Sequence, residues 1–372
     1  MSLQVFDLSA ENAPVRESAL SRLAALFDNS EFASGYRDGP VEELERTLAR
    51  WCGRRYALGM GSGTLALEAA AIALDLGPGD EVVVPANTFL ATAAAVAARG
   101  AKVVAADVDD QTWNLSAQTV ARAVGPRTRA VFAVNLYGNP CPWDELEALG
   151  LPVVEDAAHS PGAQYAGRNG VRQSGGLGRL SAFSFFPSKT LGAIGDAGMV
   201  LFDDPAAVEP LRAWRNCGQG EKHRAVMLGT VARMDVLQAA FLLEKWRVFE
   251  AGLAHRRQLA AVYDECFRDS PVRTQRTLPG SLSGHWVYVV RVPDRAAVTT
   301  ALQAADIGWS IQYPYLLQQQ PFWEGVAARP LETPVADVFV QEILTLPLHR
   351  GLSEADVRRV AEVVLSAVRE PS

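Results

Sequence analysis

The chain has 372 residues, of which 49% are hydrophobic and 21% charged, and its formal net charge is −7 at pH 7. This length is sufficient for a large core and is more typical of two domains than of one. The acidic balance argues against nucleic-acid binding, and no apolar run approaches the roughly 20 residues that would span a bilayer.

The four cysteines and five histidines are dispersed along the chain. No CxxC, HxxxH or HxH pair occurs, so the sequence indicates neither a metal site nor a disulfide framework. Scattered cysteines fit a reducing compartment, and the first 20 residues lack the basic and apolar regions of a signal peptide. We therefore expect a cytoplasmic protein without a metal.

Between about residues 54 and 205, short apolar runs alternate with helical patterns. The strand-like runs are RRYALGM, EVVVP, KVVAADV, RAVFAVN, LPVVED and GMVLF, and the helical stretches include TLALEAAAIALDLG, TFLATAAAVAARG and WDELEALG. Strands that are apolar throughout and alternate with helices indicate a mostly parallel sheet covered on both faces. This part of the sequence predicts a three-layer α/β domain.

Residues 233–265 have helical periodicity and predict one long helix, or two in series, that connects two lobes. Beyond it, HWVYVVRV, RAAVTTALQAADI and GWSIQYP predict a strand, a helix and a strand. In the last predicted helix, Ser353 and Asp356 have the spacing of a capping box. We expect a large domain over residues 1–250 and a smaller C-terminal α/β domain over residues 251–372.

The stretch LGMGSGTLALEAA places Ser62 and Thr64 between a predicted strand and the start of a helix. Free backbone N–H groups and the positive end of the helix dipole suit a phosphate there. A tight turn without a ligand is the alternative. A nicotinamide site is less compatible, because the glycines at 59, 61 and 63 depart from GxGxxG and no acidic residue ends the second strand.

Three further residues lie near predicted strand ends. Asp156 directly follows an apolar strand, at the edge where open α/β sheets bind ligands, and could pair with a pyridinium nitrogen. His159 could hydrogen-bond to a substituent of the same cofactor, and Phe89 could stack on its ring. Each also has a structural interpretation, as a helix cap, a core histidine and a core phenylalanine.

The stretch SAFSFFPSKTLGAIGDAGMVLF places Lys189 in apolar or small surroundings, after a strand that contains Ser184. Desolvation lowers the pKa of a lysine and frees its amine, as Schiff-base formation requires. A predicted phosphate-binding turn at residues 62–64, the carboxylate of Asp156 and the lysine segment at residues 184–189 follow one another along the chain. Together they predict a pyridoxal 5′-phosphate (PLP) site in which Lys189 holds the cofactor and then transfers protons.

The ordered motifs resemble the sugar aminotransferases of the DegT/DnrJ/EryC1/StrS family, within the fold-type I PLP enzymes. The match runs nearly end to end and includes ASGYRDGPVEELERTLARWCGRRYALGMGSGTLALEAA, VPANTFLATAAAV, NLYGNP, VVEDAAHSPGA, SFFPSKTLGAIGDAGMV, RNCGQG, RMDVLQAAFL and LPLHRGLSEADVRRV. The resemblance implies an aspartate-aminotransferase-like large domain. It also implies a homodimer in which each active site is completed by the partner subunit.

The resemblance assigns roles to matching positions. Lys189 would be the Schiff-base lysine and Asp156 the partner of the pyridine nitrogen. His159, usually Gln in the family, would lie beside the ring hydroxyl, and Phe89 would be the stacking aromatic residue. The family's phosphate-binding positions are occupied by Gly63, Thr64 and Ser184.

Two departures from the family pattern concern the cofactor and the substrate. Where members commonly carry an Asn that crosses the dimer to the phosphate, this chain has Val231, which cannot donate a hydrogen bond. A segment near the sugar site that is often rich in histidine reads IQYPYLLQQQPFW here. Gln312, Tyr313 and Gln318 are the substrate-contact candidates in that segment.

The resemblance implies transamination of a nucleotide-linked keto-deoxysugar, in deoxyaminosugar and natural-product biosynthesis. L-glutamate or L-glutamine would convert PLP to pyridoxamine 5′-phosphate, which would then aminate the sugar. The stretch SFFPSKTLGAIGDAG is closer to members that act on 3-keto than on 4-keto sugars. A cyclitol aminotransferase acting on a scyllo-inosose-type ketone and a non-catalytic PLP-binding regulatory protein are the alternatives, whereas family dehydratases carry histidine in place of the lysine.

Overall fold

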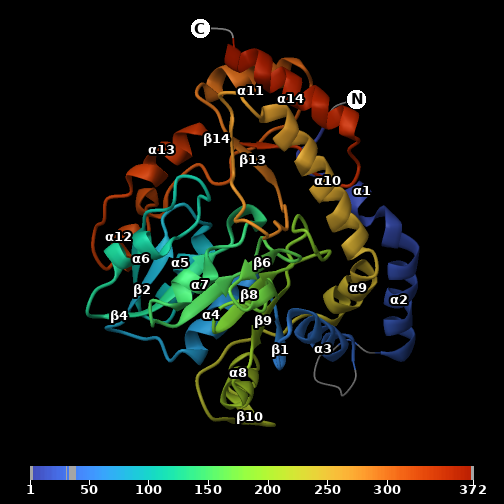
Figure 1. Ribbon diagram of the computed structural model, residues 1–372. Helices are drawn as coiled ribbons and strands as arrows, with labels where there is room; N and C mark the ends of the chain where they lie inside the picture. Colours follow the sequence, from blue (N-terminus) through green and yellow to red (C-terminus); the bar gives the residue numbers. More distant parts are fainter. Residues whose placement is uncertain (1–2, 31, 33–38, 370–372) are drawn as a thin grey trace.

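The computed structural model describes residues 3–30, 32 and 39–369, and a sheet flanked by helices forms its centre (Figure 1). The start of the family resemblance, at residues 33–38, lies outside the described residues. The seven strands follow the order β1-β9-β8-β5-β4-β2-β3. Their bounds are β1 Tyr56–Met60, β2 Glu81–Pro85, β3 Lys102–Ala106, β4 Thr128–Val134, β5 Val153–Asp156, β8 Leu180–Ser184 and β9 Gly198–Phe202.

Strand β9 runs antiparallel to β1 and β8, and the other neighbouring pairs are parallel, so the predicted mostly parallel sheet is confirmed. The strands are apolar throughout because both faces of the sheet are covered. Along β9, Val200 belongs to a buried cluster with residues of α4 and α5, whereas Met199 and Leu201 belong to one with residues of α3 and α9. The helices of this unit are α3 Pro40–Cys52, α4 Gly63–Ala73, α5 Leu90–Ala97, α6 Ala117–Ala123, α7 Trp143–Glu147, α8 Val208–Trp214 and α9 Val236–Trp246.

The predicted connector consists of two helices in series. Helix α9 ends at Trp246, and α10, Phe249–Phe267, begins after a two-residue break. At the N-terminus, α1 Leu8–Asn12 and α2 Arg16–Asn29 lie beside these helices (Figure 1). The two helices therefore lead the chain from the large sheet to a second, smaller sheet.

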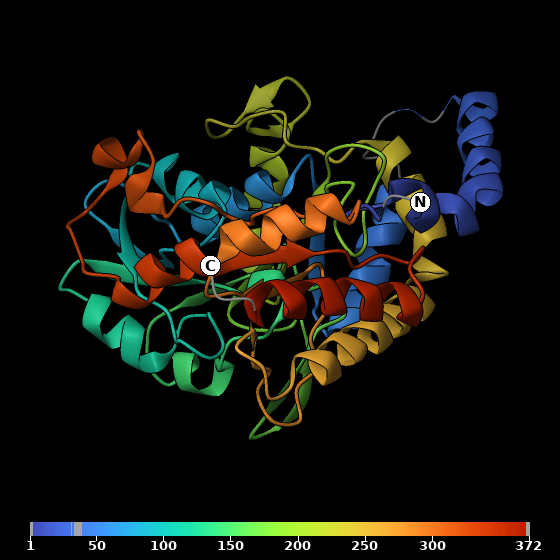
Figure 2. The same cartoon turned by 90° about the horizontal axis from the view of Figure 1, so that it is seen from above.

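The second sheet is antiparallel and has the order β12-β13-β14. Figure 2 shows α11 and α14 side by side on this sheet. The elements of the unit are β12 Arg273–Thr274, β13 Tyr288–Arg291, α11 Arg295–Ala304, α13 Pro334–Glu342, β14 Ile343–Leu346 and α14 Glu354–Arg369, whereas α12 Trp323–Val326 lies against the large sheet. The capping box is present, since Asp356 N donates to Ser353 Oγ at 3.2 Å and Ser353 N donates to Asp356 Oδ2 at 2.9 Å.

The prediction of a strand for GWSIQYP is wrong. In this stretch only Ser310 pairs, through an isolated bridge to Thr345 of β14. Pro314 lacks a backbone donor and cannot extend such a ladder, and Gln312 and Tyr313 line a cavity instead. The division of the chain near residue 250 stays a prediction.

None of the helices in the described residues is long and apolar enough to cross a membrane. Within the same residues, no three side chains among His, Cys, Asp and Glu come together as a group that could hold a metal ion. The four cysteines are unpaired, and Cys52 and Cys141 are buried.

Candidate active site

A cavity of about 480 Å³ opens at the carboxyl edge of the large sheet. Residues that follow or end β1, β2, β4, β5 and β8 reach it, as expected for ligand sites of open parallel sheets. Segments before β13 and after α11 close it from the other side. The predicted site residues that line it are Gly63, Thr64, Phe89, Asp156, His159, Ser184, Lys189, Gln312 and Tyr313.

The turn between β1 and α4 exposes the N-terminus of an eleven-residue helix to the cavity. Ser62 is the N-cap, and its Oγ accepts from Leu65 N at 3.2 Å, which leaves its proton free to donate. A Cβ added at Gly63 would lie 2.7 Å from Cβ of Ser184, the last residue of β8. Glycine at position 63 therefore allows the helix terminus and the Ser184 hydroxyl to face one spot, where a phosphate would find several donors.

Asp156 ends β5 and is almost completely buried. Its Oδ2 accepts from Thr92 Oγ1 at 2.8 Å, and its Oδ1 accepts from Ala158 N at 3.1 Å. Burial raises the pKa of this carboxyl, while these hydrogen bonds and the charge of Lys189 oppose the rise. Each oxygen keeps a free lone pair, so the carboxylate can accept one more proton donor inside the cavity.

His159 is fixed between protein partners on both ring nitrogens. Nδ1 accepts from the Tyr137 backbone N–H at 3.3 Å, so the neutral ring carries its proton on Nε2, which lies 3.1 Å from Tyr313 Oη. Burial, followed by the nearby Lys189 charge, lowers the pKa of His159 well below its ordinary value. The ring is therefore a neutral donor at its cavity-facing edge.

Lys189 is partly buried, and the loss of solvation lowers its pKa to about 7, while the Asp156 charge opposes that shift. Its Nζ lies 3.7 Å from the ring centroid of Trp286. This indole stacks on His159 with centroids 4.1 Å apart and donates from Nε1 to Ser188 O at 2.7 Å. A large fraction of the lysine amine is thus unprotonated and nucleophilic near neutral pH, and the amine lies against the Trp286 ring.

The candidate substrate residues divide into two groups. Gln312 and Tyr313 line the cavity, with the Tyr313 ring 5.3 Å from that of Phe89. Gln318 does not line it, because its Nε2 donates to Thr333 Oγ1 at 2.6 Å. Val231 is 64% exposed and also lies outside this cavity.

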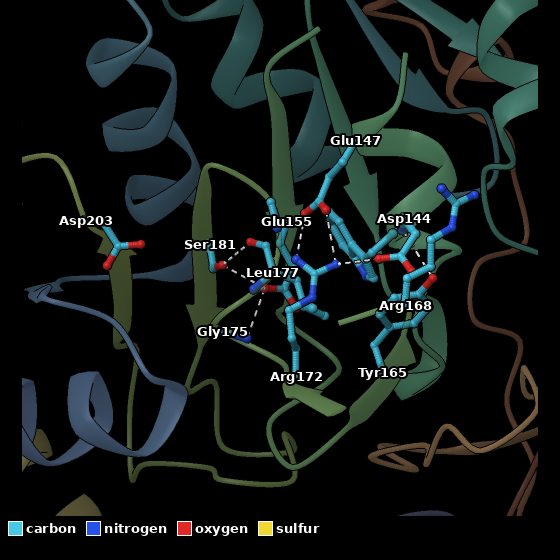
Figure 3. A network of polar contacts seen from close by, with 12 residues as sticks. Asp144, Glu147, Glu155, Tyr165, Arg168, Arg172, Gly175, Leu177, Ser181 and Asp203 are labelled. Atoms are coloured by element: carbon cyan, nitrogen blue, oxygen red, sulfur yellow. Dashed lines mark hydrogen bonds and ion pairs between the residues drawn. The ribbon is translucent and has the colours of Figure 1, made fainter. Parts of the chain in front are cut away.

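Glu155, next to Asp156 on β5, anchors the loop that precedes β8 (Figure 3). Its Oε1 accepts from Asn135 Nδ2 and Ser174 Oγ, and its Oε2 accepts from Ser181 Oγ, at 2.8, 2.6 and 2.7 Å. The backbone N–H groups of residues 175 and 177 also donate to Oε2. Five donors thus surround one fully buried carboxylate, and they fix the strand end that carries Asp156.

Sequence reasoning missed two residues that shape the site. Trp286 comes from a strand-like run more than a hundred residues from His159, so no spacing could connect them. Thr92 had a readable signal, because it is a polar residue in an otherwise apolar helix segment, LATAAAVA, that follows a strand end. A buried hydroxyl in such a helix needs a partner.

Comparison with known proteins agrees with the motifs. The model of the DegT/DnrJ/EryC1/StrS aminotransferase family matches residues 15–365. The chain is 34% identical over 360 residues to the UDP-2-acetamido-2-deoxy-3-oxo-D-glucuronate aminotransferase of Pseudomonas aeruginosa, covering 96% of this chain and 98% of that protein. It is also 34% identical over 363 residues to the dTDP-3-amino-3,4,6-trideoxy-alpha-D-glucose transaminase of Streptomyces venezuelae, covering 96% and 94%.

The fold also agrees with that of a solved structure. The crystal structure of DesV from S. venezuelae superimposes with a TM-score of 0.93 at 33% identity, covering 100% of both chains. The predicted α/β fold with a mostly parallel central sheet is thus confirmed. The chain belongs to the DegT/DnrJ/EryC1/StrS family of PLP-dependent aminotransferases.

Proposed function

We propose that this cavity binds PLP through Lys189 and transfers an amino group to a nucleotide-linked keto sugar. The observation that carries the proposal is the convergence of a nucleophilic lysine, a buried carboxylate and a free helix N-terminus on one cavity. When bound, PLP supplies an electron sink for amino-group transfer. These three groups fit PLP. The helix N-terminus suits its phosphate, the carboxylate suits its ring nitrogen, and the lysine amine suits its aldehyde.

Each predicted site residue in the cavity would have its own role in binding PLP. The α4 N-terminus at Gly63 and Thr64, with Ser184, would hold the phosphate. Asp156 would keep the ring nitrogen protonated, and Phe89 would cover one face of the ring. His159 would donate from Nε2 to the ring oxygen, which is the role that an amide donor fills in other members. Lys189 would bind the cofactor and, once released, carry the proton at its Nζ.

We infer a 3-keto sugar nucleotide as the acceptor. The two relatives described above are named for a 3-oxo and a 3-amino sugar, and the lysine loop reads GDAG where 4-keto members tend toward TGEGG. The amino donor would be L-glutamate or L-glutamine, in deoxyaminosugar biosynthesis.

The acceptor assignment can be tested by direct competition. The pyridoxamine 5′-phosphate form of the protein is mixed with dTDP- and UDP-linked 3-keto sugars, their 4-keto isomers and scyllo-inosose. We expect the 3-keto nucleotide sugars to restore PLP with the highest kcat/KM. Faster recovery with a 4-keto sugar or with the cyclitol would overturn the acceptor assignment.

We also propose that a second copy of the chain covers the mouth of the cavity. Apolar side chains are exposed on the loops around it: Phe89, Leu90, Phe186 and Ile194. The segment around the hairpin of β10 Gln219–Glu221 and β11 Arg224–Ala225 projects from the body (Figures 1 and 2) and exposes Val226, Leu228 and Val231. Exposed apolar groups gathered in this way are typical of a protein interface.

Replacing Leu228 with aspartate tests this interface. Leu228 is 96% exposed, so the change costs little in an isolated subunit but would bury a charge in a dimer. We expect the dissociation constant of the dimer to rise about a hundredfold or more in sedimentation equilibrium. Val338→Asp, on α13 far from the hairpin, is the control (Figure 1). A monomeric unaltered protein, or an unchanged L228D dimer, would refute the interface.

A further inference from the structure

Thr92 is a fully buried residue, 0% exposed, on the helix that follows β2. A helical threonine commonly satisfies its hydroxyl at a carbonyl one turn back. Here the hydroxyl instead lies 2.8 Å from Asp156 Oδ2 and 3.1 Å from Thr88 Oγ1. Thr92 does not line the cavity, but both of its hydroxyl partners, Asp156 and Thr88, do, so it reaches a ligand only through them.

Proton counting fixes the direction of these hydrogen bonds. Asp156 Oδ1 takes the Ala158 N–H and Oδ2 faces Thr92, so an ionised carboxylate accepts at both oxygens. The Thr92 hydroxyl has one proton, which it donates to Asp156 Oδ2. Thr88 must then donate to Thr92, and the two hydroxyls form a short relay that ends on the carboxylate.

The other ionisable groups near Asp156 do not replace this relay. Burial raises the pKa of Tyr313 and of Cys141, so both keep their protons. Lys189 supplies the opposite charge, but its amine becomes committed to the cofactor once PLP is bound. The hydrogen bonds from Thr92 and Ala158 then remain to favour the ionised carboxyl group.

We propose that Thr92 is a positioning residue that holds Asp156 ionised and in one orientation, ready for the ring nitrogen of PLP. This inference rests on the proposed function. Without the hydroxyl, the carboxylate of Asp156, which is only 4% exposed, loses a charge-assisted hydrogen bond. It would then hold the proton of the ring nitrogen less firmly, although every group that touches PLP would still be present.

Thr92→Val removes the hydroxyl with little change of shape, and Thr92→Ser retains it. We expect T92V to raise the dissociation constant for PLP about tenfold and T92S to stay within about twofold of the unaltered protein. In a pH titration of the visible band of bound PLP, T92V should raise the apparent pKa of the Lys189 nitrogen by about one unit. The reason is that a less protonated ring repels that proton less.

Thr345→Val is the matched control, because Thr345 is equally buried and its hydroxyl meets no hydrogen-bond partner among the described residues. Its PLP affinity and titration should match those of the unaltered protein. Equal PLP affinity and titration in T92V and T345V would overturn the positioning role, as would a T92S protein that behaves like T92V. If the unaltered protein forms no band with PLP, or if K189A retains it, the proposed function fails and this inference fails with it.

Discussion

Lys189→Ala is expected to abolish turnover, with kcat reduced about a thousandfold or more. The amine is the group in the cavity whose pKa is lowered to about 7, so at neutral pH a large fraction is unprotonated and nucleophilic. Below that pH the amine is protonated, so attachment of PLP to the unaltered protein should speed up as the pH rises through about 7. Steady-state assays and the absorbance of bound PLP measure both effects.

Lys102→Ala is the control for this variant, since Lys102 is exposed on β3, away from the cavity, and its Nζ donates to the Gly325 carbonyl at 2.9 Å. It should retain the activity and the PLP band. Lys189→Arg keeps a cation over Trp286 but provides no amine that can join PLP. Appreciable activity in K189A or K189R would contradict the role assigned to the lysine.

Glu155→Gln is expected to destabilise the protein by about 3 kcal/mol, which would lower the melting temperature by about 4 °C. The five groups around Glu155 all donate to it, and three of them, Asn135 Nδ2 and the backbone N–H groups of residues 175 and 177, cannot accept. A glutamine must turn its own N–H₂ toward some of them. Asn135 cannot rotate to compensate, because its Oδ1 already accepts from Cys141 N and Trp143 Nε1. Buried donors are therefore left without acceptors.

Glu147→Gln is the matched control, drawn in the same network in Figure 3. Glu147 pairs with Arg172 at 2.9 Å near the surface, where such a pair contributes about 0–1 kcal/mol. Its melting temperature should change little. Equal melting temperatures for E155Q and E147Q would show that the buried network is not what anchors the loop before β8.

The large sheet could be predicted because its strands are apolar throughout and alternate with helices, a pattern that both covered faces impose. GWSIQYP could not be separated from a strand by pattern alone. It has strand composition, yet Ser310 alone pairs there and the chain then enters the cavity at Gln312 and Tyr313. The conformation of that segment depends on tertiary contacts, which local propensity does not encode.

The site was predictable where a residue follows a strand end. Asp156 and Ser184 end strands, and Gly63 begins the helix after one, so topology alone brings them together. Trp286 enters from the segment before β13, and Gln318 points to Thr333 although it is close in sequence to Gln312. These two depend on how the C-terminal unit packs on the sheet, which spacing does not determine.

The visible spectrum of the protein with PLP, before and after L-glutamate or L-glutamine, tests the central claim most directly. We predict a yellow band that is absent in K189A and that fades when one of these amino donors is added, as the amino group passes to the cofactor. A band that neither donor changes, or one that K189A retains, would contradict an aminotransferase built on Lys189.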